Sequence, residues 1–391
     1  MRTQSELARS LDLARRQTDA LFELVRPDSL YERPIPERHR IIFYLGHLEA
    51  FDWNLIGRQA LGRRAFHADF DRLFAFGIDP PPGKLPEDRP SDWPSFAEVD
   101  RYNRRTRDEI DEGLEDVPEQ LLNVAIEHRL MHAETFAYIL HNLDYSRKAA
   151  PFPDLPLPPA HRPPERRMVE IPAGTARLGR TAEEGFGWDN EFAAHEVEVP
   201  PFRIAKQKVT NREYLEFVVE AGGEVPFYWS DRDGRWFYRA MFSEVPLPLD
   251  APVYVTHDQA EAFAHWRGQS LPSEAQFHRA ASFAAPSANL DSRRWDPLPV
   301  TADSQAEAPA DGPLQMVGNG WEWTSTVFAP FPGFQPFDFY PNYSKPFFDG
   351  EHFVLKGAGP RTAACFLRSS FRNWFRRAYP YVHAGFRLVA S

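Results

Sequence analysis

A stretch dense in proline divides this chain of 391 residues into two unlike parts. Seven of the fourteen residues from Pro151 to Pro164 are proline. Proline lacks a backbone N–H and clashes with a helix interior, so this stretch can neither continue a helix nor join a central strand, and it favours an extended connection. We therefore expect an N-terminal domain over residues 1–148, a Pro-rich linker over 149–166 and a C-terminal domain over 167–391.

The composition excludes several classes of protein. Asp and Glu outnumber Lys and Arg by 56 to 45, so there is no basic excess to displace counterions from phosphates, and we expect no nucleic-acid partner. We also expect no membrane partner, because no apolar run approaches the ~18 residues of a membrane helix. No signal peptide is evident, and Cys365 is the single cysteine, which rules out a disulfide framework or thiolate metal site within one chain. A reducing cytoplasm is the compartment we expect.

The residues before the linker have the apolar spacing of helices. Four segments, 4–25, 38–60, 97–115 and 118–146, place apolar residues at intervals of three and four. Four helices of this length predict a four-helix bundle. The proline-rich residues 77–96 would then form a long connection between the second and third helices, and long connections of this kind are often functional.

The residues after the linker follow a different pattern. Short apolar runs at 168–171, 197–199, 253–255 and 353–355 predict strands, while 210–220 and 257–267 predict helices. Long irregular stretches lie between them and carry many aromatic side chains, which can fill a core from loops. We interpret Trp321, Glu322 and Trp323 as part of the scaffold of this core.

The sharpest local signal is a pair of histidines four residues apart, His128 and His132, in the fourth predicted helix. Four residues advance a helix by about 400°, so the two imidazoles share one face and can bind one metal ion. Glu134 points elsewhere and suits a supporting hydrogen bond better than direct coordination. The alternative is a structural pair, because this spacing also occurs by chance.

A third ligand is expected from another helix. His47 is the strongest candidate because it lies mid-helix among apolar residues, and Gly46 beside it permits close approach of a neighbouring helix. His39, His67 and His141 are competitors in more polar or terminal positions. Three neutral imidazoles leave coordination positions open for other ligands, and both Fe(II) and Zn(II) accept such a set. The single histidines interpreted as surface or structural residues are His195, His257, His265 and His383.

Further motifs in the C-terminal part are Ile171–Gly174, Val209–Asn211, Leu271–Phe277, Gly318–Thr324, Phe371–Trp374 and Gly385–Leu388. With the histidines before them, in this order, the chain resembles the sulfoxide synthases of ergothioneine biosynthesis and their selenoneine synthase relatives, over nearly its whole length. The resemblance implies an α+β fold. Its N-terminal part would be a DinB-like four-helix bundle, and its C-terminal part a formylglycine-generating-enzyme-like (C-type-lectin-like) domain rich in irregular structure.

The same resemblance implies an oxygen-dependent chemistry at iron. His47, His128 and His132 would hold Fe(II), and the substrates would be O2 and hercynine, the trimethylated betaine of histidine. A carbon–sulfur or carbon–selenium bond would form at the imidazole C2. Because small-molecule sites often lie between domains, we expect this site where the two domains meet.

The substrate pocket is also implied by matching residues. Tyr340 would be the catalytic tyrosine near the iron and Tyr343 would line the betaine pocket, although the sequence leaves open which of the two is the proton donor. Asn373 and Trp374 match the residues that hold the trimethylammonium group. Aromatic faces suit such a cation, which has no hydrogen to donate in a conventional hydrogen bond.

Two departures from the family pattern bear on the sulfur or selenium donor. Family members that use γ-glutamylcysteine commonly carry Gln before the third ligand and Asp after the Asn-Trp pair, where this chain has Met131 and Phe375. Phe375 cannot replace the charge or hydrogen bonds of Asp, so we favour a selenosugar donor. Arg372, Arg376 and Arg377 favour the alternative, γ-glutamylcysteine or cysteine, because guanidinium groups could clamp a carboxylate. The predicted substrate-binding set is Met131, Tyr343, Asn373, Trp374, Phe375 and Arg376.

Two other classes of function remain as alternatives. A zinc-dependent thiol transferase could use the same three histidines and would work without oxygen. A non-catalytic small-ligand-binding module on the lectin-like domain would bind without turnover and would tolerate loss of the histidines.

Overall fold

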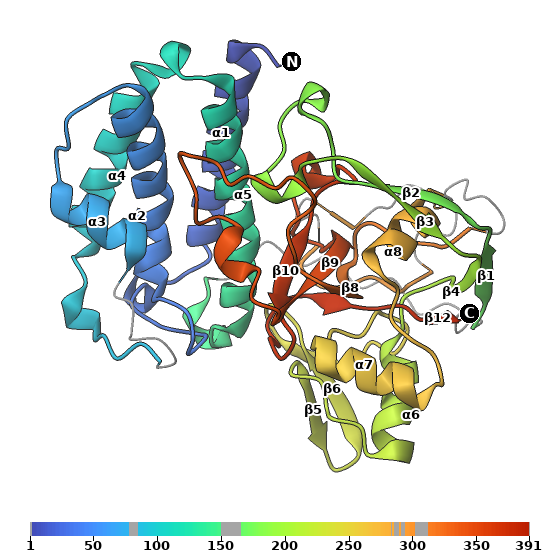
Figure 1. Cartoon of the computed structure of the whole chain (residues 1–391). Helices are drawn as coiled ribbons and strands as arrows, with labels where there is room; N and C mark the ends of the chain where they lie inside the picture. The colour runs from blue at the N-terminus through green and yellow to red at the C-terminus, as the bar shows by residue number, and fades with distance from the viewer. Residues whose placement is uncertain are drawn as a thin grey trace. The chain divides into compact units, whose positions relative to one another are not determined.

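The computed structural model describes residues 2–77, 85–149, 166–282, 284, 289–290, 294–301 and 312–390. The chain divides into two compact units, Met1–Phe152 and Pro153–Ser391, and each is described by itself (Figure 1). Most of the predicted linker 149–166 and part of the predicted connection 77–96 lie outside the described residues.

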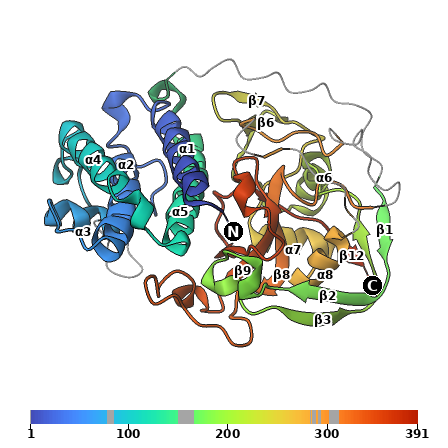
Figure 2. The ribbon, with the colours of Figure 1, turned by 90° about the horizontal axis from the view of Figure 1, so that it is seen from above.

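The first unit is helical. Its main helices are α1 (Gln4–Phe22), α2 (Ile41–Asp52), α3 (Ala68–Phe76), α4 (Phe96–Asp111) and α5 (Glu119–Asn142), and α2 continues as a π-helical segment, Trp53–Ala60. α1 packs against α5, and α2 packs against α3, α4 and α5, as the view along the helices in Figure 2 shows. The predicted four-helix bundle is confirmed, with α3 as an additional short helix that the apolar spacing does not predict.

Capping and burial explain why these helices form where they do. The Thr3 side chain caps α1 by accepting from the Glu6 N–H, and the Glu6 carboxylate accepts from the Thr3 N–H at 2.7 Å. These bonds satisfy donors that a helix end leaves unpaired. The buried apolar residues of α1 recur every three or four positions. Nearly every residue of α2 is buried instead, so α2 is a central helix and any polar side chain on it needs a partner inside the bundle.

The described residues of the second unit form four small sheets. The largest has the order β10-β9-β8-β11, formed by β8 (Gly320–Val327), β9 (His352–Ala358), β10 (Asn373–Arg376) and β11 (Ala384–Gly385). The others are β1-β4-β12 (Met168–Ile171, Phe202–Ala205, Val389–Ala390), β2-β3 (Gly174–Leu178, His195–Val199) and β5-β6-β7 (Trp229–Arg232, Arg235–Arg239, Glu244–Pro246). Three helices, α6 (Asn211–Ala221), α7 (His257–Trp266) and α8 (Glu274–Ala281), accompany them.

Most of the predicted elements of this unit are confirmed, and one is wrong. The runs at 168–171, 197–199 and 353–355 lie in β1, β3 and β9, and the predicted helices correspond to α6 and α7. Residues 253–255 do not form a strand. The N–H of Val253 donates to the Val209 carbonyl at 3.0 Å, while that of Val255 donates to the Ala384 carbonyl at 2.9 Å. Because these partners belong to different segments, no continuous ladder forms.

The core of the second unit confirms the scaffold interpretation of the tryptophan motif. Trp321 and Trp323 are buried in β8. Glu322 between them is buried with two cations, Lys208 at 2.6 Å and Arg387 at 2.6 Å, which compensate its charge. None of the helices in the described parts of the chain combines the length and the apolar character that crossing a bilayer requires.

Candidate metal centre and tyrosine segment

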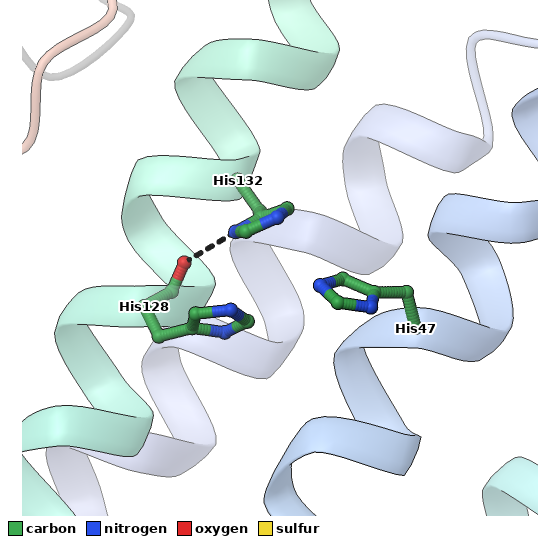
Figure 3. Close-up of side chains that lie close together, drawn as sticks. All are labelled: His47, His128 and His132. Atoms are coloured by element: carbon green, nitrogen blue, oxygen red, sulfur yellow. Dashed lines mark hydrogen bonds between the residues drawn. The ribbon is translucent and has the colours of Figure 1, made fainter. Parts of the chain in front are cut away.

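Three histidines from two helices converge inside the first unit. α2 carries His47, and α5 carries His128 and His132 one turn apart. Each offers one ring nitrogen such that all three nitrogens lie within 4.8 Å of one another. Figure 3 shows the rings facing a common point between the two helices. The competing candidates His39, His67 and His141 are outside this group.

Hydrogen bonds to backbone carbonyls fix the tautomers of two of these rings. His47 Nδ1 lies 2.7 Å from the carbonyl oxygen of Phe74, and His132 Nδ1 lies 3.1 Å from that of His128. A carbonyl oxygen only accepts, so each Nδ1 donates its hydrogen and each Nε2 keeps a lone pair. This is the arrangement that orients imidazoles as metal ligands.

Gly46 makes the first of these bonds possible. α3 lies against α2 at this glycine, so that a Cβ built on Gly46 would lie 2.4 Å from the ring of Phe74. The prediction that Gly46 admits a neighbouring helix is therefore confirmed. The helix it admits, α3, supplies the Phe74 carbonyl that orients His47.

Burial keeps the three imidazoles neutral. It lowers the pKa of His47 to about 4 and that of His132 to about 3, and it lowers the pKa of His128 well below its ordinary value. At neutral pH each ring therefore keeps one nitrogen lone pair that can bind a metal ion. Aromatic rings flank them: Phe51 stacks on His128 at 3.4 Å between centroids, and Phe43 lies 4.8 Å from His47.

A buried ion network ties the two histidine-bearing helices together. Arg129 on α5 donates to Glu49 at 3.0 Å and to Asp52 at 2.6 Å, both on α2, and all three side chains are buried. Arg107 on α4 also donates to Glu49, at 2.7 Å. The network spans the same two helices as the histidines, so it helps to set their separation.

The remaining predicted residues of the bundle, Met131 and Glu134, are half-buried on α5. The Glu134 carboxylate does not belong to the group of ligand atoms close enough to share one ion with the three histidines. For Glu134 this agrees with the expectation that it is not a direct ligand.

The predicted tyrosines of the second unit lie close together. The rings of Tyr340 and Tyr343 are 5.6 Å apart, and Tyr343 meets the edge of Trp374 at 5.4 Å. Burial, together with the negative charge of Asp189, raises the pKa of Tyr340 to about 12, so this phenol keeps its proton at neutral pH. Trp374 is stacked on Phe328 at 4.3 Å, and the side chain of Asn373 accepts the Trp374 N–H at 2.9 Å.

The arginines near Trp374 differ in their partners. Arg372 is buried and bonds Glu274 at 3.1 Å, so it belongs to the scaffold. Arg377 pairs with Asp258 and with Glu261, the latter at 3.2 Å. These two carboxylates and His257 form a second cluster with ligand atoms near one another, and Arg377 pairs with both carboxylates. Arg376 is exposed on β10, and Phe375 stacks on Tyr379 at 4.9 Å.

Several residues of these sites escape sequence reasoning. The Phe74 carbonyl could not be identified because backbone groups carry no sequence signal, and Asp189 lies in an irregular loop without periodicity. Arg129, Glu49 and Asp52 did leave a signal, because charged residues that interrupt the apolar faces of two central helices need partners within the bundle.

Comparisons with known proteins define the two units. Residues 10–141 match the DinB superfamily, and residues 155–391, more than half of the chain, match the sulfatase-modifying factor enzyme 1-like domain. The chain is thus a DinB bundle followed by a domain of this second family.

Relatives with both parts identify the family. A protein named hercynine oxygenase from Mycolicibacterium smegmatis is 35% identical over 350 residues, covering 78% of this chain and 79% of the relative. Ergothioneine biosynthesis protein 1 from Neurospora crassa is 25% identical, covering 94% of this chain and 55% of the relative. Among solved structures, PvdO from Pseudomonas aeruginosa aligns with 59% of this chain and 99% of its own, with a TM-score of 0.41 and 21% identity. The chain belongs to the ergothioneine/selenoneine synthase family, which confirms the resemblance found in its motifs.

Proposed function

We propose that this protein is an Fe(II)- and O2-dependent enzyme that joins selenium from a selenosugar donor to the imidazole C2 of hercynine. The names of its relatives support hercynine as the substrate. The observation that carries the proposal is the group of three neutral imidazoles on α2 and α5, two of which are oriented by backbone carbonyls. Replacing a C–H and an Se–H bond by one C–Se bond releases two protons and two electrons, and O2 is the acceptor of these electrons.

The histidine group fits a ferrous ion on chemical grounds. Three imidazoles on one side of an ion leave positions open to other ligands, as a catalytic metal requires. Bound iron would supply the redox chemistry that lets O2 react with paired-electron substrates. His47, His128 and His132 would hold it, and the Phe74 carbonyl would fix the orientation of His47.

The tyrosine segment would bind the substrate and donate a proton. We assign proton donation to Tyr340, whose phenol stays protonated at neutral pH. Tyr343 and Trp374, whose rings meet edge to face, would offer aromatic surface to the trimethylammonium group, with Asn373 beside them. Interactions with aromatic faces recognise such a cation without a hydrogen bond.

The partners of the arginines support the selenosugar over γ-glutamylcysteine. Two of the three arginines that could clamp a γ-glutamyl carboxylate are already paired with acidic residues, which leaves the exposed Arg376. Phe375 and Met131 add no charge that would meet an α-amino acid group. A donor without such a group fits this set better. Met131, Phe375 and Arg376 remain our proposed contacts for the donor.

The metal assignment is tested by Fe(II) binding to metal-free protein under anaerobic equilibrium dialysis. His47→Ala removes one of three ligands and should weaken binding by more than the ~100-fold that loss of a supporting partner can cost. The control is His265→Ala, which changes an exposed histidine of α7. A His47→Ala protein that retains a full equivalent of iron at wild-type affinity would show that the ligand assignment is wrong.

The donor and the proton donor are tested by turnover. Iron-loaded enzyme, hercynine and O2 are mixed with a selenosugar or with γ-glutamylcysteine, and products are followed by mass spectrometry. Faster product from the thiol would overturn the selenium assignment, and product without O2 would favour the zinc transferase. Tyr340→Phe should slow turnover far more than it weakens hercynine binding; unchanged turnover would point to Tyr343 or another donor.

A further inference from the structure

A buried loop beneath the tyrosine segment is unusually polar. Trp188, Asp189 and Asn190 lie at the start of a 3-10 turn (Asp189–Glu191) and are at most 1% exposed. The next residue, Glu191, anchors the turn: it accepts from Arg368 at 2.6 Å and from the Ser370 hydroxyl at 2.6 Å. The loop is therefore held rigidly from one side.

Its other side holds the segment Tyr340–Ser344, about 150 residues further along the chain. The Trp188 ring stacks on Tyr343 with centroids 4.0 Å apart, and its edge meets Tyr340 at 6.4 Å. The Ser344 hydroxyl donates to the Asp189 carboxylate and accepts from the Asn190 side chain at 2.9 Å. Ser344 itself is fully buried. Stacking thus fixes Tyr343, and hydrogen bonds fix Ser344.

The second carboxylate oxygen of Asp189, Oδ2, differs in its surroundings from the first, which accepts from Ser344. This Oδ2 atom is buried and has no hydrogen-bond partner within the described part of the chain. An unmatched buried polar atom is costly, whether it is this oxygen or the NH2 group that Asn would place there. The side-chain oxygen of either residue can accept from the Ser344 hydroxyl. Burial raises the pKa of Asp189 to about 6, against the opposing hydrogen bond from Ser344. The charged and titratable groups that act with Asp189 are Glu191, which is paired with Arg368, and the phenol of Tyr340.

We propose that Trp188, Asp189 and Asn190 form a platform that positions the Tyr340–Ser344 segment, with Asp189 as the positioning residue that holds the Ser344 hydroxyl. This inference rests on the proposed function, in which Tyr340 acts as the proton donor. It adds residues that the motif resemblance does not assign, because they lie in a loop that is remote in sequence.

The first test compares Asp189→Ala, Asp189→Asn, Ser344→Ala and Tyr340→Phe in the iron-loaded full chain. Displacement of a reacting group by about 1 Å costs up to ~100-fold in rate, so Asp189→Ala and Ser344→Ala should lower kcat by about 10- to 100-fold while the hercynine Kd stays near wild type. Asp189→Asn keeps an oxygen that accepts from Ser344, so it should restore most of the rate lost in Asp189→Ala. The matched control is Asp338→Asn, an exposed carboxylate near the same segment. Trp188→Phe should retain activity because it keeps a stacking ring, whereas Trp188→Leu should not.

A second readout does not depend on activity. Hydrogen exchange of metal-free protein should show faster exchange in the peptide containing Tyr340–Ser344 for Ser344→Ala, with an unchanged urea midpoint for the whole chain. If Tyr340→Phe is slow but Asp189→Ala and Ser344→Ala both turn over at the wild-type rate, the platform is overturned and the role of Tyr340 stands. If Tyr340→Phe itself keeps full turnover, the proposed proton donor fails and the positioning role fails with it.

Discussion

Arg129 offers a stringent test of how the bundle holds its histidines. Its guanidinium, on α5, bridges Glu49 and Asp52 of α2 with its side chain about 1% exposed. The substitution Arg129→Met keeps much of the volume but leaves these two buried carboxylates without their shared cation. Glu49 keeps a second partner in Arg107, whereas Arg129 is the basic group that pairs with Asp52.

The expected cost follows from the burial of the network. Removing one partner of a buried ion pair typically costs about 3–5 kcal/mol, because the remaining charge stays desolvated. At 1.36 kcal/mol per tenfold, a loss of about 3 kcal/mol accelerates opening-limited hydrogen exchange by roughly 150-fold. We expect this acceleration in peptides from α2 and α5 of the metal-free protein.

The control and the rescue make this prediction specific. Arg16→Met on α1 removes an ion pair with Asp12 whose side chains are more than half exposed, so exchange should stay at the wild-type rate. Adding Glu49→Gln and Asp52→Asn to Arg129→Met should restore part of the stability, because neutral amides need no cation. If Arg129→Met exchanges no faster than Arg16→Met, the reasoning about an uncompensated buried charge is refuted.

Two further predictions concern packing and pH. Gly46→Ala places a Cβ against the ring of Phe74. We expect the free energy of unfolding, measured in urea, to fall by about 1–3 kcal/mol and Fe(II) binding to weaken. Unchanged iron affinity would show that α3 does not orient His47. His383 is buried against Tyr254, and burial lowers its pKa to about 3, so the unfolded chain takes up a proton below about pH 6.5 that the folded chain refuses. The free energy of unfolding should therefore fall with falling pH between about 6.5 and 3, by up to about 1.4 kcal/mol per pH unit from this group. In urea titrations at pH 7 to 4, the free energy of unfolding of His383→Phe should depend less steeply on pH than that of the wild type. Equal slopes for the two proteins would contradict a buried neutral imidazole.

Apolar periodicity was sufficient to predict the long helices but not the short helix α3 that packs against α2. α1, α2, α4 and α5 each repeat apolar residues over at least three turns, which distinguishes a helix from other structures. α3 has nine residues, too few for a firm periodic signal, yet it supplies the carbonyl that orients His47. The helix that completes the histidine group was therefore the one that the sequence could not show.

In the second unit, local pattern and tertiary pairing disagree in one place. Val253 and Val255 alternate with Tyr254 as in a strand, but each backbone N–H finds a different partner segment. Strand propensity describes side chains that fit a half-buried surface, and it cannot tell whether a neighbouring backbone continues alongside. The Asp189 platform could not be predicted from local sequence for a similar reason, because its partners lie about 150 residues away.

Charge balance explains why the histidine group stands apart from the other buried polar clusters described here. Glu322 is enclosed by Lys208 and Arg387, and Glu191 is bound by Arg368, so in each case opposite charges compensate within the protein. The three histidines are neutral, and the two whose Nδ1–H groups are bonded to carbonyls hold Nε2 lone pairs available to a shared point. Converging lone pairs repel one another, and burial keeps protons from relieving that repulsion. A cation bound by all three nitrogens relieves it, which is why this cluster, rather than His257 with its Arg377-paired carboxylates, is the site where we expect metal.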